Sequence, residues 1–190
     1  MAHSHPLSDW QLHCARRTVL GGGVIAYPTE AVWGLGCDPW DQEAVEKVLE
    51  LKQRPVEKGV ILVASSLDQV RFLVDPLPPL LRAEAERHWP GPVTCLLPDP
   101  ERQVPEWVRG KHSSIAVRVS EHPVVRALCE ATGMPLVSTS CNPAGRPPAR
   151  HIWQVRGYFG DQLDWIVPGA LGGNRKPSRI IDIVSGQQLR

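Results

Sequence analysis

Short apolar runs alternate with amphipathic segments along the whole chain, and most changes of pattern fall near glycine or proline. Apolar residues at helical spacing predict helices, whereas short aliphatic and β-branched runs predict buried strands. The alternation of the two predicts a single α/β domain. The expected helices cover 8–20, 41–51, 66–74, 78–88, 122–132 and 151–159, and the expected strands cover 24–27, 60–64, 93–97, 114–119, 136–138, 165–167 and 179–184.

Two segments carry no clear period and are expected to be loops. Residues 29–39 are rich in glycine and aromatic residues, and residues 98–113 are mostly polar. The triple glycine at 21–23 follows a predicted helix and precedes a strand, which is the reverse of a phosphate-binding loop. We therefore expect it to end the helix rather than to bind an anion.

Composition narrows the class of protein. The 190 residues are 42% hydrophobic and 22% charged, which is typical of a globular domain. A net charge of +1 means that any anion binding must come from local clusters of basic residues. No signal peptide, membrane span or paired metal ligands are visible, and five scattered cysteines predict a reduced, cytoplasmic protein. We expect one domain over 1–190, with 1–7 as a mobile tail and no second C-terminal domain.

Lys52 and Arg54 lie at the end of a predicted helix, one residue apart. Basic residues are favoured there because they complement the helix dipole by ~0.3–1 kcal/mol, and position alone gives this interpretation about half the weight. Against it, Arg54 lies beyond the last periodic apolar residue, and Lys58 follows closely. Three cations on a short loop before a strand suit a polyphosphate ligand.

A second polar run, residues 138–142, directly follows a predicted strand. It could be a simple turn, because serine and asparagine readily bond nearby backbone. Ligands, however, bind beyond the C-terminal ends of strands in open α/β sheets. Cys141 within this run has no sequence-local base, so we expect a buried filler rather than a nucleophile. Further basic residues at Arg146, Arg150, Arg175, Lys176, Arg179 and Arg190 suggest a shared positive concavity.

Taken together, these segments resemble the YrdC family in its short, single-domain form, over nearly the whole chain. The combination is specific because several motifs occur in the same order. They are residues 27–36 (YPTEAVWGLG), 51–55 (LKQRP), 89–94 (WPGPVT), 116–119 (AVRV), 138–142 (STSCN), and Ser178 with Ile180.

The resemblance implies a twisted mixed α/β sheet, flanked by helices, with a large, positively charged concave cavity. It implies synthesis of threonylcarbamoyl-adenylate and pyrophosphate from L-threonine, bicarbonate or CO₂, and ATP. Mg²⁺ is expected with ATP, held mainly by phosphates. A separate tRNA threonylcarbamoyl-transferase complex would then modify the adenosine next to the anticodon. tRNA or double-stranded RNA is a possible further partner, and no membrane is expected.

The resemblance also implies roles for particular residues. Lys52 and Arg54 would hold the triphosphate, and Ser140 and Asn142 the nucleotide side; these four are the candidate catalytic residues. Further ATP contacts would come from Ser114 and Arg190, and the L-threonine set would be Thr29, Arg118, Ser138 and Ser178. A guanidinium at Arg118 suits an amino-acid carboxylate.

Two positions and one segment depart from the family pattern. Trp33 stands where Tyr or Phe is usual, Cys141 stands where Ala is common, and residues 143–145 (PAG) replace a more usual Ser-Gly ending. The main alternative is a non-catalytic RNA-binding module in tRNA or ribosome maturation. The residues favour the enzyme, since neutral hydroxyl donors suit a small ligand, whereas nucleic-acid binding mainly needs spread cations. Carbamoylation of a target other than tRNA shares the first step and stays open.

Overall fold

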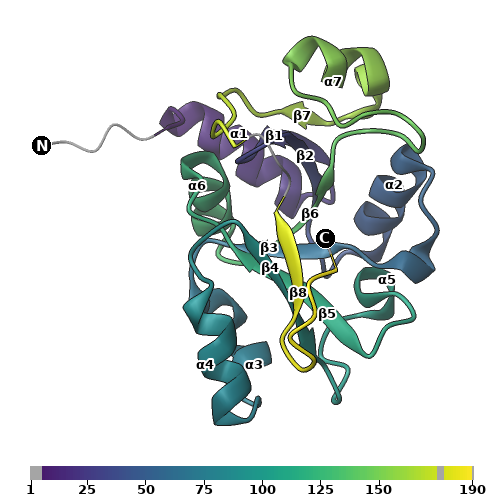
Figure 1. Ribbon diagram of the computed structural model, residues 1–190. Helices are drawn as coiled ribbons and strands as arrows, with labels where there is room; N and C mark the ends of the chain where they lie inside the picture. Colours follow the sequence, from purple (N-terminus) through teal and green to yellow (C-terminus); the bar gives the residue numbers. More distant parts are fainter. Residues whose placement is uncertain (1–5, 175–177, 190) are drawn as a thin grey trace, which may run out of the picture.

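The computed structural model describes residues 6–174 and 178–189. Eight strands form one mixed sheet in the order β7-β1-β2-β6-β3-β5-β4-β8 (Figure 1). The strands are β1 (Ile25–Pro28), β2 (Trp33–Gly36), β3 (Ile61–Ala64), β4 (Val93–Pro98), β5 (Ser114–Val119), β6 (Leu136–Ser140), β7 (Trp165–Ile166) and β8 (Arg179–Asp182). The helices are α1 (Asp9–Leu20), α2 (Gln42–Lys52), α3 (Arg71–Val74), α4 (Pro79–Arg87), α5 (Glu106–Arg109), α6 (Pro123–Thr132) and α7 (Ile152–Phe159).

Most of these elements begin and end where the sequence signals predict. Ser8 caps α1 through a capping box with Gln11, and Gly21 ends that helix as expected. Asp41 caps α2 by accepting a hydrogen bond from the Ala44 N–H at 3.1 Å. The Asp41 side chain thus fixes the start of α2, and the left-handed backbone of Gln53 ends the helix directly after Lys52.

Two predicted loops contain regular structure, and one predicted helix is broken. Residues 29–39 include strand β2, and residues 98–113 include the short helix α5. The expected helix at 66–74 is a 3₁₀ turn, Leu67–Val70, followed by the four-residue α3. Strand β2 lacks the usual β-branched pattern because Gly34 and Gly36 pack against the Tyr27 ring: a Cβ would be tight at Gly34 and has no room at Gly36.

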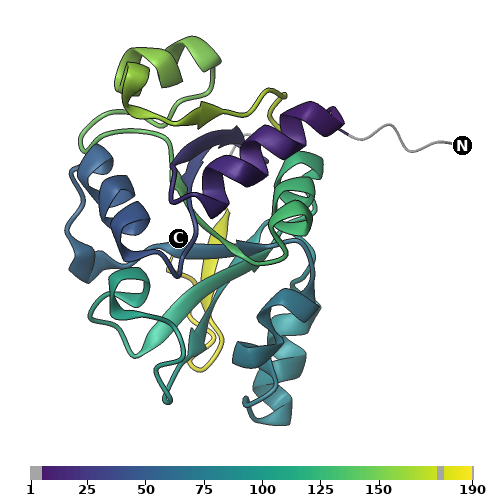
Figure 2. The same cartoon turned by 180° about the vertical axis from the view of Figure 1, so that it is seen from behind.

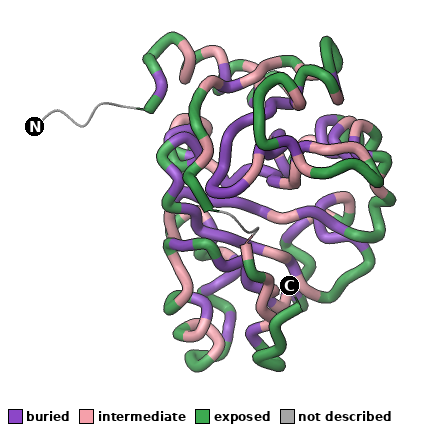
Figure 3. The backbone as a smooth tube through the Cα atoms, turned by 45° about the horizontal axis from the view of Figure 1, so that its top comes forward, coloured by how far each residue is buried: buried purple, intermediate pink, exposed green. Residues whose placement is uncertain are grey.

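Apolar side chains alternate between the two faces of the sheet. Leu62 and Ala64 of β3 belong to the larger core cluster, whereas Val63 belongs to the smaller one. Helices α1 and α6 lie side by side and cover β1 on the face with the smaller cluster (Figures 1 and 2). Buried backbone follows the central strands, while exposed positions concentrate in helices and connections (Figure 3). None of the helices among the described residues is long and apolar enough to cross a lipid bilayer.

Candidate functional site

A cavity of about 410 Å³ lies against the central strands. Its walls come from the β1–β2 turn, from β2, β3, β5 and β6, and from the segment leading into β8. The volume falls within the range of small-molecule sites. Its basic lining residues are Arg54, Lys58, Arg109 and Arg118, and the single acidic residue among the described lining residues is Glu30.

The strand register arranges the polar wall residues in order along the sheet. Ile61 of β3 is paired with both Ser138 of β6 and Ala116 of β5. Because β6 runs opposite to β3 and β5, Ser140 and Ser114 lie toward one end of this row. Arg118 lies at the other end, about 13 Å from Ser114 at ~3.3 Å per residue. We call the end at Ser114 and Ser140 the hydroxyl-rich end of the cavity, and the end at Arg118 the guanidinium end.

Three of the six predicted ATP residues line the cavity: Arg54, Ser114 and Ser140. The Arg54 Nε donates to the Gly59 carbonyl at 3.1 Å, and its Nη2 donates to the Lys58 carbonyl at 3.3 Å. Burial lowers the pKa of Arg54, but a guanidinium in a protein stays charged. Arg54 is therefore a fixed cation near the hydroxyl-rich end.

Lys52 does not lie on the cavity wall but holds the polar run at the end of β6. Its ammonium donates to the backbone carbonyl of Ser140 and to that of Asn142, the latter at 3.0 Å. The Asn142 side-chain oxygen lies 3.4 Å away, and the Ser140 hydroxyl 3.5 Å. Burial, and then the nearby Arg54 charge, lower the pKa of Lys52 to about 8. Most of the amine is therefore still protonated at neutral pH.

Asn142 also lies behind the wall, where its Nδ2 donates to the Arg146 carbonyl at 2.8 Å. It thus fixes the loop after β6, the loop in which the sequence departs from the family pattern. Arg190, the sixth predicted ATP residue, lies outside the described residues. Its neighbour Leu189 lines the cavity.

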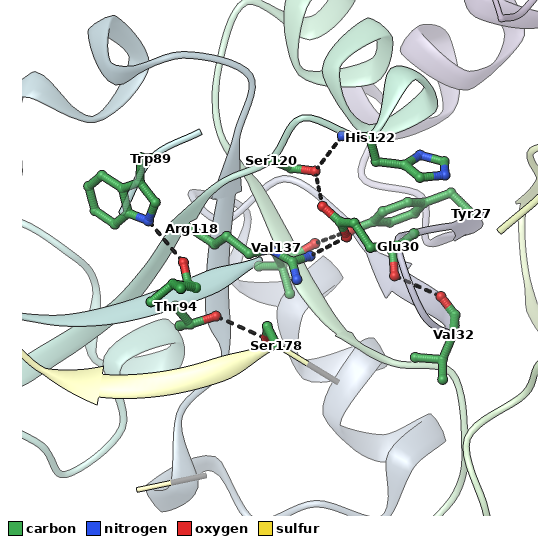
Figure 4. Close-up of polar contacts among 12 residues, drawn as sticks. Tyr27, Glu30, Val32, Trp89, Thr94, Arg118, Ser120, His122, Val137 and Ser178 are labelled. Carbon is green, nitrogen blue, oxygen red and sulfur yellow. Dashed lines mark hydrogen bonds and ion pairs between the residues drawn. The ribbon is translucent and has the colours of Figure 1, made fainter. Parts of the chain in front are cut away.

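All four predicted threonine residues line the cavity, and Figure 4 shows several of their contacts. The Thr29 hydroxyl donates to the Val32 carbonyl at 2.7 Å. The hydroxyls of Ser178 and Thr94 lie 3.2 Å apart, and the register places Thr94 beside Arg118. Ser138 lies between the two ends of the row, on the same side of β6 as Ser140.

Arg118 makes an ion pair with Glu30, whose Oε2 lies 3.2 Å from the Arg118 Nη2 (Figure 4). Glu30 also accepts a hydrogen bond from the Ser120 hydroxyl, and that hydroxyl accepts one from the His122 backbone N–H at 3.1 Å. Burial lowers the pKa of the His122 imidazole. The sequence analysis missed Glu30 as a site residue, although it follows Thr29 directly.

Arg109 is a second cavity residue that the sequence analysis missed, because it lies in the segment predicted as a loop. Helix α5 packs against the 3₁₀ turn at 56–58, where a Cβ on Gly59 would be 2.6 Å from the Arg109 carbonyl. This close approach brings Arg109 to the same cavity as Arg54 and Lys58. The only sequence signal for it was its basic character.

Several candidates from the sequence are not part of the cavity. Arg146, Arg150 and Arg179 are not lining residues, and Arg175 and Lys176 lie outside the described residues. Burial raises the pKa of the Cys141 thiol to about 12, so this cysteine is the expected filler and not a thiolate nucleophile. Within 6–174 and 178–189, no cluster of His, Cys, Asp and Glu could hold a metal ion.

Comparisons with known proteins agree with this architecture. The Sua5/YciO/YrdC family model, described as telomere recombination, matches residues 17–190. A threonylcarbamoyl-AMP synthase of Marinobacter nauticus is 80% identical, with 100% of both chains covered. Another, from Pseudomonas aeruginosa, is 56% identical over 97% of this chain and 98% of its own.

Solved structures show the same fold. P. abyssi Sua5 complexed with L-threonine matches with a TM-score of 0.85 and 31% identity, over 93% of this chain and 52% of that one. This chain thus spans about half of that Sua5 chain. E. coli YciO matches with a TM-score of 0.79 and 28% identity, over 94% of this chain and 87% of its own. By sequence and by fold, the chain belongs to the Sua5/YciO/YrdC family.

Proposed function

We propose that this protein is a threonylcarbamoyl-AMP synthase, a nucleotidyltransferase that acts on L-threonine, CO₂ or bicarbonate, and ATP. One observation carries the proposal: three of the residues expected to bind ATP and all four expected to bind L-threonine line one cavity, at separable ends. Full-length relatives named as threonylcarbamoyl-AMP synthases support it, as does a Sua5 structure that holds L-threonine. The non-catalytic RNA-binding alternative is not favoured.

The hydroxyl-rich end suits a nucleotide triphosphate. Arg54 and Lys58 provide cations, while the Ser114 and Ser140 hydroxyls provide neutral donors. Lys52 adds its charge from behind the wall and keeps Ser140 and Asn142 in position. Mg²⁺ would accompany ATP as part of the substrate, held mainly by phosphate oxygens and water.

The guanidinium end suits an amino acid. Arg118 receives the α-carboxylate, and the hydroxyls of Thr29, Ser138 and Ser178 bond the remaining polar groups of L-threonine. This orientation directs the amine toward the middle of the cavity, where CO₂ adds to nitrogen and a proton leaves. A carbamate then forms within reach of the α-phosphate at the other end.

The reaction next joins the carbamate to the nucleotide. A carbamate oxygen attacks the α-phosphorus, the bond from the α-phosphorus to the bridging oxygen breaks, and pyrophosphate leaves. With bicarbonate as the carbon source, one water is also released. The protein supplies little covalent chemistry, so its contribution is positioning and charge neutralisation by the fixed cations.

The product is an activated threonylcarbamoyl group, which fits transfer to a tRNA adenosine by a separate complex. All five cysteines are free thiols, in keeping with a reducing compartment such as the cytoplasm. The test is to incubate purified protein with ATP, bicarbonate and L-threonine, following pyrophosphate and the mass of the adenylate. Pyrophosphate release that is absent, or that does not need threonine, would contradict the proposal.

A further inference from the structure

Glu30 and Arg118 form a buried ion pair at the edge of the cavity, with only 7% and 8% of each residue exposed. Burying two charges costs several kcal/mol per ion unless attraction and further hydrogen bonds offset the loss of water. Here the offset is incomplete. The Glu30 Oε2 and the Arg118 Nε are both buried, and neither has a hydrogen-bond partner of good geometry among the described residues. Such incompletely matched groups in a native protein call for a functional explanation.

The Glu30 side chain is held from behind by a buried hydroxyl. Ser120, which is 0% exposed, donates to the Glu30 Oε1 and accepts the His122 N–H. The His122 Nε2 lies 3.2 Å from the Ala170 carbonyl. This ring nitrogen is thus directed to a backbone carbonyl and not to the Glu30 carboxylate.

The backbone of Glu30 is fixed as well. The Gly172 N–H donates to the Thr29 carbonyl at 3.0 Å, and the Asn174 N–H donates to the Glu30 carbonyl at 2.9 Å. A Cβ on Gly172 would be 2.9 Å from the Glu30 Cα, so the segment before β8 lies directly on this residue. Side-chain contacts from residues 118–120 and backbone contacts from residues 172–174 thus restrain Glu30 before any substrate binds.

We propose that Glu30 is a positioning residue for substrate recognition: it fixes the Arg118 guanidinium for the α-carboxylate of the amino acid, and Ser120 in turn fixes Glu30. The inference rests on the proposed function and deepens it. With its charge balanced by Glu30, Arg118 leaves this end of the cavity close to neutral, which suits a zwitterionic amino acid with an uncharged side chain. Misplacing such a guanidinium by ~1 Å can cost about a hundredfold in rate.

The test uses Glu30→Gln, which keeps the shape of the side chain and an oxygen for Ser120 but removes the charge. We expect the KM and the calorimetric Kd for L-threonine to rise about tenfold or more, while the KM for ATP stays within about twofold. Ser120→Ala should shift threonine affinity in the same direction, by about threefold, since it loosens Glu30 without removing its charge. Both variants leave the residues of the hydroxyl-rich end unchanged, so ATP binding should be preserved.

Asp99→Asn is the matched control, because Asp99 is a buried carboxylate 3.9 Å from another cavity arginine, Arg109. Its threonine Kd should stay at the wild-type value. Circular dichroism verifies folding, and Ser120→Ala carries the test if Glu30→Gln does not fold. Unchanged or tighter threonine binding in the folded variants overturns the inference, as does an equal rise of both KM values. Failure of the wild type to release pyrophosphate with threonine would instead overturn the proposed function.

Discussion

A substitution at Lys52 can distinguish a catalytic role from a structural one. The buried charge of Lys52 costs folding free energy, whereas the same charge is expected to stabilise the transition state. We expect Lys52→Met to reduce pyrophosphate formation at least about tenfold, which corresponds to about 1.4 kcal/mol of transition-state stabilisation. The same substitution should change the free energy of unfolding by less than about 2 kcal/mol. We therefore predict a large loss of rate together with a small change in stability.

The small stability change follows from two opposing terms. A fall in the Lys52 pKa from 10.5 to about 8 means that keeping the amine charged in the fold costs about 3 kcal/mol. Removing the amine recovers that cost but takes a donor from the Asn142 carbonyl, a loss of about 1–3 kcal/mol. The Ser140 carbonyl keeps the Asn142 N–H as a donor at 3.0 Å. The two terms therefore nearly cancel.

The large activity change follows from position. Lys52 connects the end of α2 to the residues that end β6, and Ser140 there lines the cavity. Without the ammonium, the run from Ser140 to Asn142 loses the cation that fixes it, and the cavity loses a nearby positive charge. Both losses act on the transition state, in which negative charge spreads over the phosphates.

The assay compares initial rates of pyrophosphate release with urea unfolding of the same preparations. Lys47→Met is the control, because Lys47 lies on the same helix but makes a half-exposed ion pair with Asp164 at 2.7 Å. That pair is worth about 0–1 kcal/mol, so the control should keep both rate and stability. Wild-type turnover in Lys52→Met would refute the reasoning and return Lys52 to a helix-end role.

Three further predictions use other features of the structure. Because Lys52 loses its proton near pH 8, the KM for ATP should rise as pH increases through about 8, and a KM that stays flat to pH 9.5 would contradict this role. Gly36→Ala should lower the free energy of unfolding by about 1–3 kcal/mol in urea titrations, since its Cβ would lie 2.5 Å from the Val137 carbonyl. Unchanged stability would show that β2 and β6 can move apart. Cys141→Ala should keep wild-type turnover, as a buried thiol with a raised pKa supplies no nucleophile, and an inactive but folded variant would revive that alternative.

The sequence predicted most elements because their signals are local. The capping residues of α1 and α2 and the apolar runs of β1, β3 and β5 lie within single segments. Strand β2 was not predicted because the contacts that make it a strand come from distant parts of the chain. Its two glycines fit against the Tyr27 ring and the β6 backbone, and that surface exists only after the sheet has formed.

The candidate site shows the same difference between residues with local signals and residues without them. Lys52, Arg54 and Ser138 to Asn142 could be singled out because polar residues follow apolar elements there. Glu30 could not, because its partners Arg118 and Ser120 lie about ninety residues away. The pairing of β2 with β6, of β6 with β3 and of β3 with β5 is what brings them near. A lone acid in a glycine-rich segment carries no sign of a buried ion pair.

The sheet order explains why one chain can hold two substrates in line. Strands β6, β3 and β5 are neighbours in space although they follow one another in a different order in sequence. Their mixed directions place Ser140 and Ser114, at the C-terminal end of one strand and the N-terminal start of another, at the same end of the cavity. An all-parallel arrangement would put these two serines at opposite ends, one of them beside Arg118. The antiparallel β6 thus keeps Ser140 at the opposite end of the row from Arg118, and under the proposed function this separation would let a nucleotide and an amino acid face each other.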